Sequence, residues 1–134
     1  MSSYTVAKVP DKPIIVVSVV GHFNVEMARA IYAKIAEIAA TIEGPIYRIT
    51  DIREERTSFA DIIHVIKEAS TGQAGTTTDP RIKNVFVGDE RMARVARDAL
   101  VRQTGVPMPM FAKLEDAFTH INNELNGFSD VSNS

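Results

Sequence analysis

The sequence predicts an α/β fold with a mixed, mostly parallel sheet of five strands and four helices. Two observations support this class: β-branched apolar runs alternate with segments of helical apolar spacing, and Gly or Pro residues bracket most of these changes. The expected order is β-β-α-β-α-β-α-β-α, which requires crossovers that place helices on the faces of the sheet. We expect one such domain over residues 1–127 and a polar tail over residues 128–134.

The first two strands are expected to form a hairpin. Residues 4–9 alternate weakly between apolar and polar, and the turn sequence PDKP follows at residues 10–13. Residues 14–20, IIVVSVV, are β-branched and apolar on both faces, which is typical of a central strand covered on both sides. Strands this close in sequence pair antiparallel.

The first helix and the third strand follow. Asn24 is the predicted N-cap of the helix, and Gly44 with Pro45 marks its predicted end. Residues 46–52 form the third predicted strand, which carries Asp51 near its end. The apolar face of the helix comprises Ala28, Ile31, Ile35, Ile38 and Ile42.

The second half repeats the alternation of helix and strand. A second helix is predicted around residues 59–69, followed by a long loop over residues 71–80 and a fourth strand over residues 82–87. Asp89 is the predicted N-cap of a third helix, and residues 110–112 form a short fifth strand before the last helix. The third helix is expected to bury Met92, Val95, Ala96, Ala99 and Leu100, and the last helix to bury Leu114, Ala117, Phe118, Ile121 and Leu125.

Composition excludes several classes of function. The 15 basic and 17 acidic residues give a formal charge of -2, so the chain lacks the basic excess typical of nucleic-acid binding. No cysteine is available for disulfides or thiolate metal sites, and no apolar run is long enough for a membrane span. We therefore expect a cytoplasmic protein that binds no nucleic acid.

The sequence contains no assembled catalytic motif. Dinucleotide-binding and phosphate-binding glycine motifs and a G-x-S-x-G nucleophile motif are all missing, and His22, His64 and His120 lack the spacing of metal ligands. We therefore predict no enzyme, no cofactor and no metal. The alternative is an enzyme that uses His22 as a base together with Asp51 or Arg48.

Arg48 is the least expected residue of the predicted third strand, because its neighbours are mostly apolar. We interpret it as structural, either reaching solvent at a sheet margin or paired with Asp51 or Glu54. An anion-binding role is the alternative.

Hydroxyl residues stand at the start of the predicted second helix. Ser58 and Asp61 fit a capping box, in which the hydroxyl and the acid satisfy free N–H groups of the first turn. We favour this interpretation over phosphorylation of Thr57 or Ser58. The two roles are compatible, because a helix N-terminus also favours a phosphate group.

Four segments together resemble the STAS superfamily, in particular small stand-alone bacterial members of uncharacterised function. The resemblance runs from about Tyr4 to Leu125 and is one of pattern. It implies a non-enzymatic regulatory or protein-binding module similar to the anti-sigma-factor antagonists. The segments are IIVVSVVGHFNVEMARAIYAKI, YRITDI, IKNVFVGDERMARVARDAL and MFAKLEDAFTHI.

The resemblance also implies a site for a protein partner. In antagonist members, a strand-end Asp precedes a Ser that a partner kinase phosphorylates at the start of the second helix. Asp51 matches that Asp, whereas TSFAD replaces the family's D-S-S-G-type helix start and places the phosphorylated position near Phe59 or Ala60. The candidate residues for regulation by a kinase-like or other protein partner are Asp51, Thr57, Ser58 and Asp61.

An alternative function is a carrier or sensor of a small apolar, lipid-like molecule, because some stand-alone relatives are thought to bind such ligands. The candidate pocket residues are Phe23, Met27, Phe59 and Phe86. We also expect a homodimer, because helical faces rich in Ala and Ile can pair.

Overall fold

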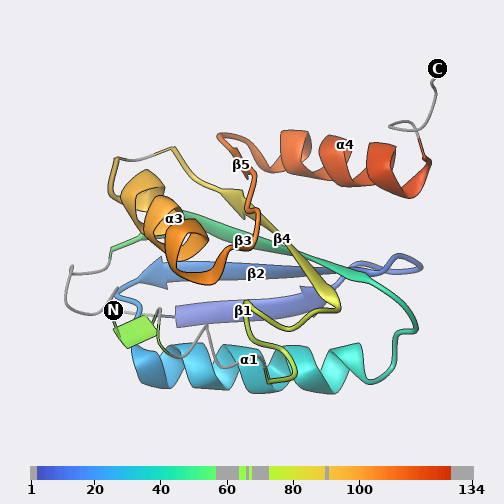
Figure 1. Ribbon diagram of the computed structural model, residues 1–134, viewed down its shortest axis with the longest axis horizontal. Helices are drawn as coiled ribbons and strands as arrows, with labels where there is room; N and C mark the ends of the chain where they lie inside the picture. Colours follow the sequence, from blue (N-terminus) through green and yellow to red (C-terminus); the bar gives the residue numbers. More distant parts are fainter. Residues whose placement is uncertain (1–2, 57–63, 66, 68–72, 90, 128–134) are drawn as a thin grey trace.

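The structure is a computed structural model that describes residues 3–56, 64, 65, 67, 73–89 and 91–127 (Figure 1). Among these residues it contains one five-stranded sheet and three helices, so the predicted α/β class with a five-stranded mixed sheet is confirmed. The predicted second helix, around residues 59–69, lies largely outside the described residues, and three helices rather than four are described. The strands are β1 (Ser3–Lys8), β2 (Ile14–Gly21), β3 (Ile46–Glu55), β4 (Ile82–Val87) and β5 (Met110–Phe111), and the helices are α1 (Val25–Ala39), α3 (Arg91–Thr104) and α4 (Leu114–Leu125).

The strands follow one another across the sheet in chain order. β1 pairs antiparallel with β2, as the hairpin prediction required, and the remaining neighbours pair in parallel. β3 is three residues longer than predicted and continues to Glu55. An irregularity in β2 between Ser18 and Val20 lets the two strands stay paired as far as Gly21 and Glu55. Asp51 therefore lies within β3 and not at its end, which corrects the prediction.

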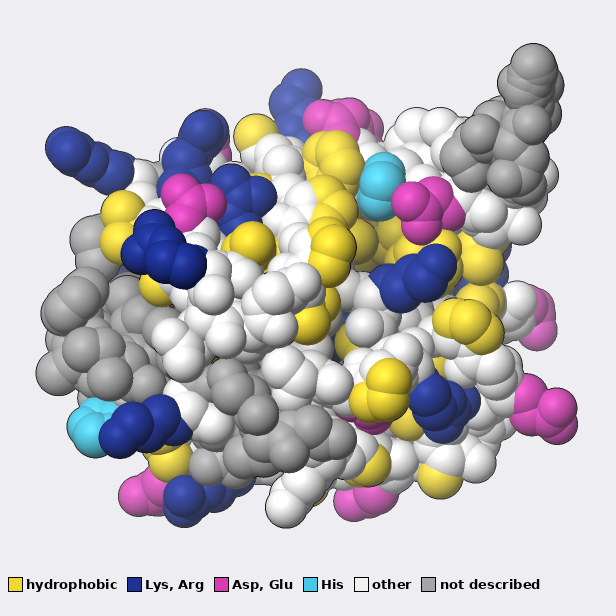
Figure 2. Space-filling view, viewed as in Figure 1, with side chains coloured by type: hydrophobic (Ala, Val, Ile, Leu, Met, Phe, Trp, Pro, Cys, Tyr) yellow, Lys and Arg dark blue, Asp and Glu magenta, His cyan; other side chains and the backbone are white. Residues whose placement is uncertain are grey.

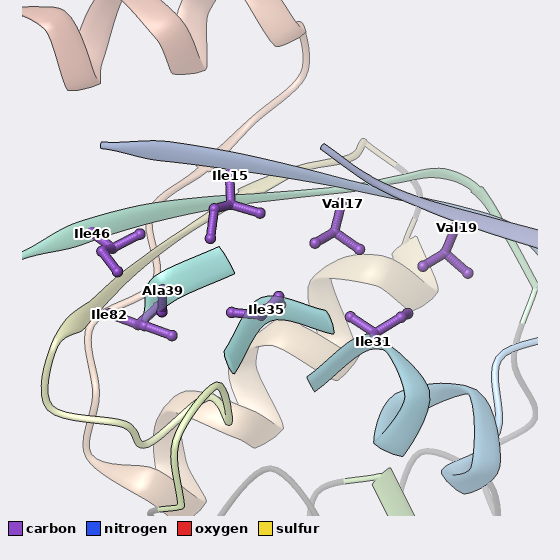
Figure 3. Close-up of a cluster of buried hydrophobic side chains, with 8 residues drawn as sticks. All are labelled: Ile15, Val17, Val19, Ile31, Ile35, Ala39, Ile46 and Ile82. Atoms are coloured by element: carbon purple, nitrogen blue, oxygen red, sulfur yellow. The ribbon is translucent and has the colours of Figure 1, made fainter. Parts of the chain in front are cut away.

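Helices cover both faces of the sheet. α1 and α4 lie on opposite sides of it (Figure 1). Side chains of β2, β3 and β4 on the first side pack against α1 in a cluster of eight buried residues (Figure 3). α3 packs on the same side through Ala93 and Leu100, which contact Ile52 and Phe86. This side, called here the α1 face, carries every second residue of each strand.

The start of α1 agrees with the sequence prediction, and its end differs from it. Asn24 is the N-cap of α1, and its side chain accepts a hydrogen bond from the Met27 amide at 2.9 Å, as predicted. The helix ends at Ala39 and not near Gly44, because the amide and the hydroxyl of Thr41 both donate to the Ile38 carbonyl and close a turn there.

The buried face of α3 is rotated relative to the prediction. Val95 was expected in the core but is 42% exposed, and Ala93, which was not expected there, is buried. Leu100 is buried as predicted. The helix is described from Arg91, and the carboxylate of Asp89 pairs with the Arg94 guanidinium at 2.9 Å. The role of Asp89 as N-cap stays a prediction.

Candidate functional site

The α1 face contains an apolar, partly open cavity of about 80 Å³ between the sheet, α1 and α3. A single water molecule needs roughly 10–15 Å³ of such space, so the cavity has room for a small group of non-hydrogen atoms. Its lining is mostly aliphatic and aromatic, with a few polar side chains. The lining residues include Val17 and Val19 of β2, Phe23, Ile31 and Tyr32, Thr50 and Ile52 of β3, Val65, Phe86 of β4, and Ala96 and Leu100 of α3.

Arg48 and Glu55 are the charged residues of this lining, and Arg48 stands at one end of it. It points to the α1 face from the middle of the sheet and is only 3% exposed. Its guanidinium donates to the Gly75 carbonyl at 2.9 Å, to the Thr77 hydroxyl at 3.2 Å and to the Asn84 side-chain oxygen. The sequence-based interpretation of a solvated or ion-paired Arg48 is therefore wrong.

Neutral groups, and not carboxylates, surround the Arg48 guanidinium. Tyr32 places its ring 5.6 Å from the guanidinium carbon, and its hydroxyl lies 3.2 Å from that of Thr77. Asp79 is the acidic residue whose charge acts on Arg48, but within the described chain it forms no ion pair with the guanidinium. The Asp79 carboxylate instead accepts from the backbone amides of Gly75 at 2.8 Å and Arg81 at 3.0 Å.

The Arg48 guanidinium has more N–H donors than the bonds above use. Three of its five N–H groups find acceptors in the bonds above. Its Nε is buried and has no hydrogen-bond partner. Burial lowers the pKa of Arg48 below its ordinary value, while Tyr32 and Asp79 act in the opposite direction. A buried cation with an unmet donor is energetically costly.

The loop over residues 73–79 holds the Arg48 end of the cavity against α1. Gly75 has a φ of +85°, and a Cβ there would lie 2.3 Å from the Tyr32 carbonyl oxygen. Only glycine therefore permits this close approach of loop and helix. Asn84 of β4 reinforces the loop, because its side-chain amide donates to the Thr77 carbonyl at 3.0 Å.

Asp51 lies on the other side of the sheet from Arg48, because the two are separated by three residues of one strand. Its carboxylate accepts two hydrogen bonds from the Arg53 guanidinium, at 2.9 and 2.6 Å, and one from the Arg53 amide at 3.1 Å. Burial alone raises the pKa of Asp51, but the bonds and charge of Arg53 lower it below its ordinary value. Asp51 is thus an ion-paired carboxylate that cannot cooperate with Arg48.

The predicted pocket residues divide into three groups. Phe23 and Phe86 line the cavity. Met27 packs against the adjoining α1 core. Phe59 lies outside the described residues, as do the predicted regulatory residues Thr57, Ser58 and Asp61.

Sequence reasoning missed the polar end of the cavity. Arg48 was recognised as unusual, but its partners Gly75, Thr77 and Asn84 lie 27 to 36 residues further along the chain. The available signal was the combination of an Arg in an apolar strand with a long loop rich in Thr and Gly. Tyr32 gave no signal, because it fits an ordinary helix flank.

Other chemistry is sparse among the described residues. They contain no group of three or more potential ligands that could hold a metal ion, and their helices are too short or too polar to cross a membrane. His22 is exposed, whereas its proposed partner Arg48 is buried.

Four arginines gather on α3, on the side of the molecule seen at the upper left of Figure 2. Two of them, Arg94 and Arg97, pair with Asp89 and Asp98, which partly neutralises this surface.

Two solved structures share this architecture. An uncharacterised protein of the DUF3478 family from Shewanella loihica PV-4, described as having a SpoIIAA-like fold, aligns with a TM-score of 0.61 and 16% identity, over 89% of this chain and 92% of its own. An anti-sigma factor antagonist from Mycobacterium paratuberculosis aligns with a TM-score of 0.54 and 17% identity, over 91% and 95% of the two chains. The chain has a STAS-like fold. The resemblance inferred from the sequence is thereby confirmed at the level of fold.

No protein-family model and no curated protein matches the sequence. Fold similarity at this identity does not by itself carry function. The function of this STAS-like chain must therefore be argued from its own cavity and surfaces.

Proposed function

We propose that this STAS-like protein is a binding module without catalytic activity, which takes a small apolar molecule into the cavity on the α1 face. The observation that carries the proposal is the cavity of about 80 Å³, lined mainly by apolar side chains and edged by a few polar ones. This combination is typical of small-molecule sites. The cavity also reaches Phe23 and Glu55, near the carboxyl ends of β2 and β3, where ligands of parallel sheets tend to bind.

The residues that line the cavity come from several strands and helices. β2, β3, β4, α1 and α3 each contribute residues, so an occupant would contact helices from two parts of the chain at once. A molecule that binds the folded chain and not the unfolded one stabilises the folded protein. Such a module can act as a sensor or as a carrier.

The direct test is native mass spectrometry of the protein purified from its own cells under conditions that retain bound molecules. We expect a population heavier than the chain by the mass of a small organic compound. The Ala96→Leu variant is expected to lose this population, because the larger side chain fills space that Ala96 now lines. Ala33→Leu is the matched control, since Ala33 is an exposed residue of α1.

A second measurement uses xenon, which enters apolar cavities. Methyl NMR signals of Val17, Ile31 and Leu100 are expected to shift under xenon pressure in the wild type and in Ala33→Leu, but not in Ala96→Leu. A wild type that carries no bound compound and shows no xenon shifts would contradict the proposal.

A second candidate function is regulation through a protein partner. The observation that favours it is the fold shared with an anti-sigma factor antagonist, whose description names a protein-directed activity. The predicted contact surface comprises Asp51, Thr57, Ser58 and Asp61, of which Asp51 is already paired with Arg53. The partner would be a kinase-like regulator or another protein, and a homodimer remains a prediction.

This second candidate is tested with Ser58→Glu. Co-purification from the native cells identifies the partner, and the substitution is expected to weaken the complex at least tenfold. The substitution also removes the predicted helix cap, which costs about 1 kcal/mol of stability. Ser58→Asn keeps a cap and adds no charge, and it should bind like the wild type. Equal affinity of Ser58→Glu and Ser58→Asn would count against this surface.

A further inference from the structure

The two edges of the sheet differ in how much backbone they leave open. At one edge, β5 has only two residues. At the other, the six described residues of β1 pair with β2 in one unbroken register and include no proline. Proteins commonly protect an edge strand by shortening it or by adding bulges, prolines or charges. β1 carries one charged side chain, that of Lys8 at its end, so its outer edge is suited to pairing with a further strand.

The hydrogen bonds between β1 and β2 determine which residues face that outer edge. The Val9 amide donates to the Ile14 carbonyl at 2.9 Å, and these two residues continue the register of the two strands. Because bonded and non-bonded pairs alternate along antiparallel strands, the odd-numbered residues of β1 bond to β2. The even-numbered residues direct their N–H and C=O groups outward. These outward-facing residues are Tyr4, Val6 and Lys8.

Apolar side chains lie beside this open edge on the α1 face. Tyr4 and Val6 are half-buried and pack at the margin of the core under α1. Met27 and Ile38 of α1 pack at the same margin. The helical period places both on the flank opposite Tyr32, which faces the cavity. An apolar margin therefore borders the outward-facing backbone groups.

We propose that β1 pairs antiparallel with β1 of a second copy, about a two-fold axis at Val6, so that the two sheets become continuous. In this register Val6 lies opposite Val6 of the second copy, and Tyr4 lies opposite Lys8. Every outward-facing residue then has a partner, and each such pair exchanges two hydrogen bonds. A two-fold axis at Thr5 or Ala7 would leave one outward-facing residue of each strand without a partner.

The side chains favour a second copy as the partner, because β1 is self-complementary in this register. Lys8 lies opposite the Tyr4 ring and not opposite another Lys, so no like charges meet across the strands. The contact is the same on both copies, and it uses up the two open edges, so the assembly closes as a dimer. This inference is independent of the proposed ligand.

The contact is small, since each copy contributes one strand of six residues. Small interfaces are typical of weak, transient complexes. We therefore expect a reversible dimer that forms in the micromolar range of protein concentration. Because the contact opens readily, the amides of β1 stay less protected than those of β3, but protection of the outward-facing amides rises with protein concentration.

Disulfide trapping tests the register, and the absence of cysteine from the sequence keeps the readout free of other thiols. In the proposed dimer the Cα atoms of the two Val6 residues are about 5.5 Å apart, which a disulfide can bridge. The two Thr5 residues are offset by about 7 Å along the strands in addition to the strand spacing, which is too far. Val6→Cys is expected to form covalent dimers about tenfold faster than Thr5→Cys, although Thr5 is the more exposed.

A second pair of variants tests the hydrogen bonds. Val6→Pro removes an outward-facing N–H and leaves the bonds to β2 in place, as proline does at sheet edges. Val6→Thr keeps the N–H and is the matched control. In sedimentation analysis of the full chain, the wild type and Val6→Thr are expected to dimerise as concentration rises, and Val6→Pro to need about tenfold more protein. Circular dichroism establishes that both variants are folded.

Three results would overturn the inference. The first is a wild type that stays monomeric up to about 1 mM, where a micromolar dissociation constant gives mostly dimer. The second is equal trapping of Val6→Cys and Thr5→Cys, or equal association of Val6→Pro and Val6→Thr, since any dimer then uses another surface. The third is trapping of Val6→Cys in cells on a different protein and not on a second copy, which would assign the edge to a foreign strand. If Val6→Pro does not fold, the trapping rates decide.

Discussion

Arg48 shows how one buried charge organises its surroundings. Its guanidinium joins the loop over residues 73–79 to β3 and β4, through the Gly75 carbonyl, Thr77 and Asn84. Asn84 is only 2% exposed and uses its oxygen for Arg48 and its amide for the Thr77 carbonyl. Removing the Asn84 side chain would leave groups of both neighbours unpaired.

The first prediction is that Asn84→Ala lowers the free energy of unfolding by about 2–3 kcal/mol, because a buried hydrogen bond to a charged group is lost. Urea denaturation measures the change. Asn123→Ala, at an exposed position of α4, is the control and is expected to stay within about 0.5 kcal/mol of the wild type. Equal stability of the two variants would show that Asn84 does not satisfy Arg48.

Tyr47 gives the second residue-scale prediction. Its hydroxyl donates to Glu124 at 2.7 Å, and burial, this bond and the Glu124 charge raise the pKa of Tyr47 to about 12. The folded state thus holds the proton more tightly than the unfolded state, whose pKa is 10.0. The resulting stabilisation is complete below pH 10 and is lost as the pH rises towards about 12.

The measurement is the free energy of unfolding of the wild type and Tyr47→Phe as a function of pH. Their difference is expected to be constant at neutral pH and to shrink between pH 10 and about 12. A difference that does not change with pH over this window would contradict the raised pKa.

Contacts between residues close in sequence could be predicted from residue types alone. Asn24 was predicted as a helix cap because capping depends on neighbours within one turn. The partners of Arg48 could not be predicted, because they are brought to it by the packing of a distant loop. The same reason explains the wrong interpretation of Arg48 as solvated or paired with Asp51.

At the scale of elements, the loop over residues 73–79 is fixed to α1 by a close backbone contact. A Cβ on Gly75 would meet the Tyr32 carbonyl oxygen and, at 3.0 Å, the Ala36 nitrogen, which are both helix backbone atoms. Gly44 provides a comparison, because it has a similar φ of +82° and no atom within 4 Å of the position that a Cβ would occupy.

The third prediction compares alanine at these two glycines. Gly44→Ala is expected to lower stability by about 1 kcal/mol, from the left-handed backbone alone. Gly75→Ala is expected to lower it by roughly 3 kcal/mol, because overpacking adds to the same strain. Thermal and urea unfolding measure both. Similar losses for the two variants would mean that the loop can move away from α1 at little cost.

Element boundaries were less predictable than element types. β3 extends past residue 52 because pairing with β2 continues beyond the irregularity at Ser18 and Val20. No local pattern in the polar sequence REE predicts a strand. α3 is rotated so that Val95 faces outward, and only its packing on Ile52 and Phe86 determines that rotation.

At the scale of the whole molecule, the order of the strands predicts how strongly the backbone amides of each strand are protected from local opening. β2, β3 and β4 are flanked on both sides, whereas β1 and the two-residue β5 lie at the edges. Opening of an edge strand breaks pairing on one side only, so it requires less free energy.

The fourth prediction is that amide hydrogen exchange is slowest in β3 and faster in β1. Native-state exchange followed by NMR measures both strands, and the β1 amides compared are those of the residues that pair with β2. Protection of β1 equal to that of β3 would show that the edge is covered in solution, and it would support the predicted homodimer.

The order of elements was predictable at this scale because it depends on alternating periods along the chain. The cavity was not predictable, since it arises from how well five elements fill the space between them. The predicted Phe23 and Phe86 line it, yet its charged end was recognised only in the structure.

The sequential sheet also has a consequence for the order in which parts of the protein can fold during synthesis. A chain emerging from the ribosome can pair β1 with β2 and then add β3 and β4 one after another, since each strand joins the edge left by its predecessor. The Arg48 contacts need nothing beyond residue 84. Leu100 and Ala96, however, are synthesised later, so the part of the apolar wall that α3 covers, at Ile52 and Phe86, faces water until α3 arrives. The binding cavity is therefore among the last features of the nascent molecule to be completed.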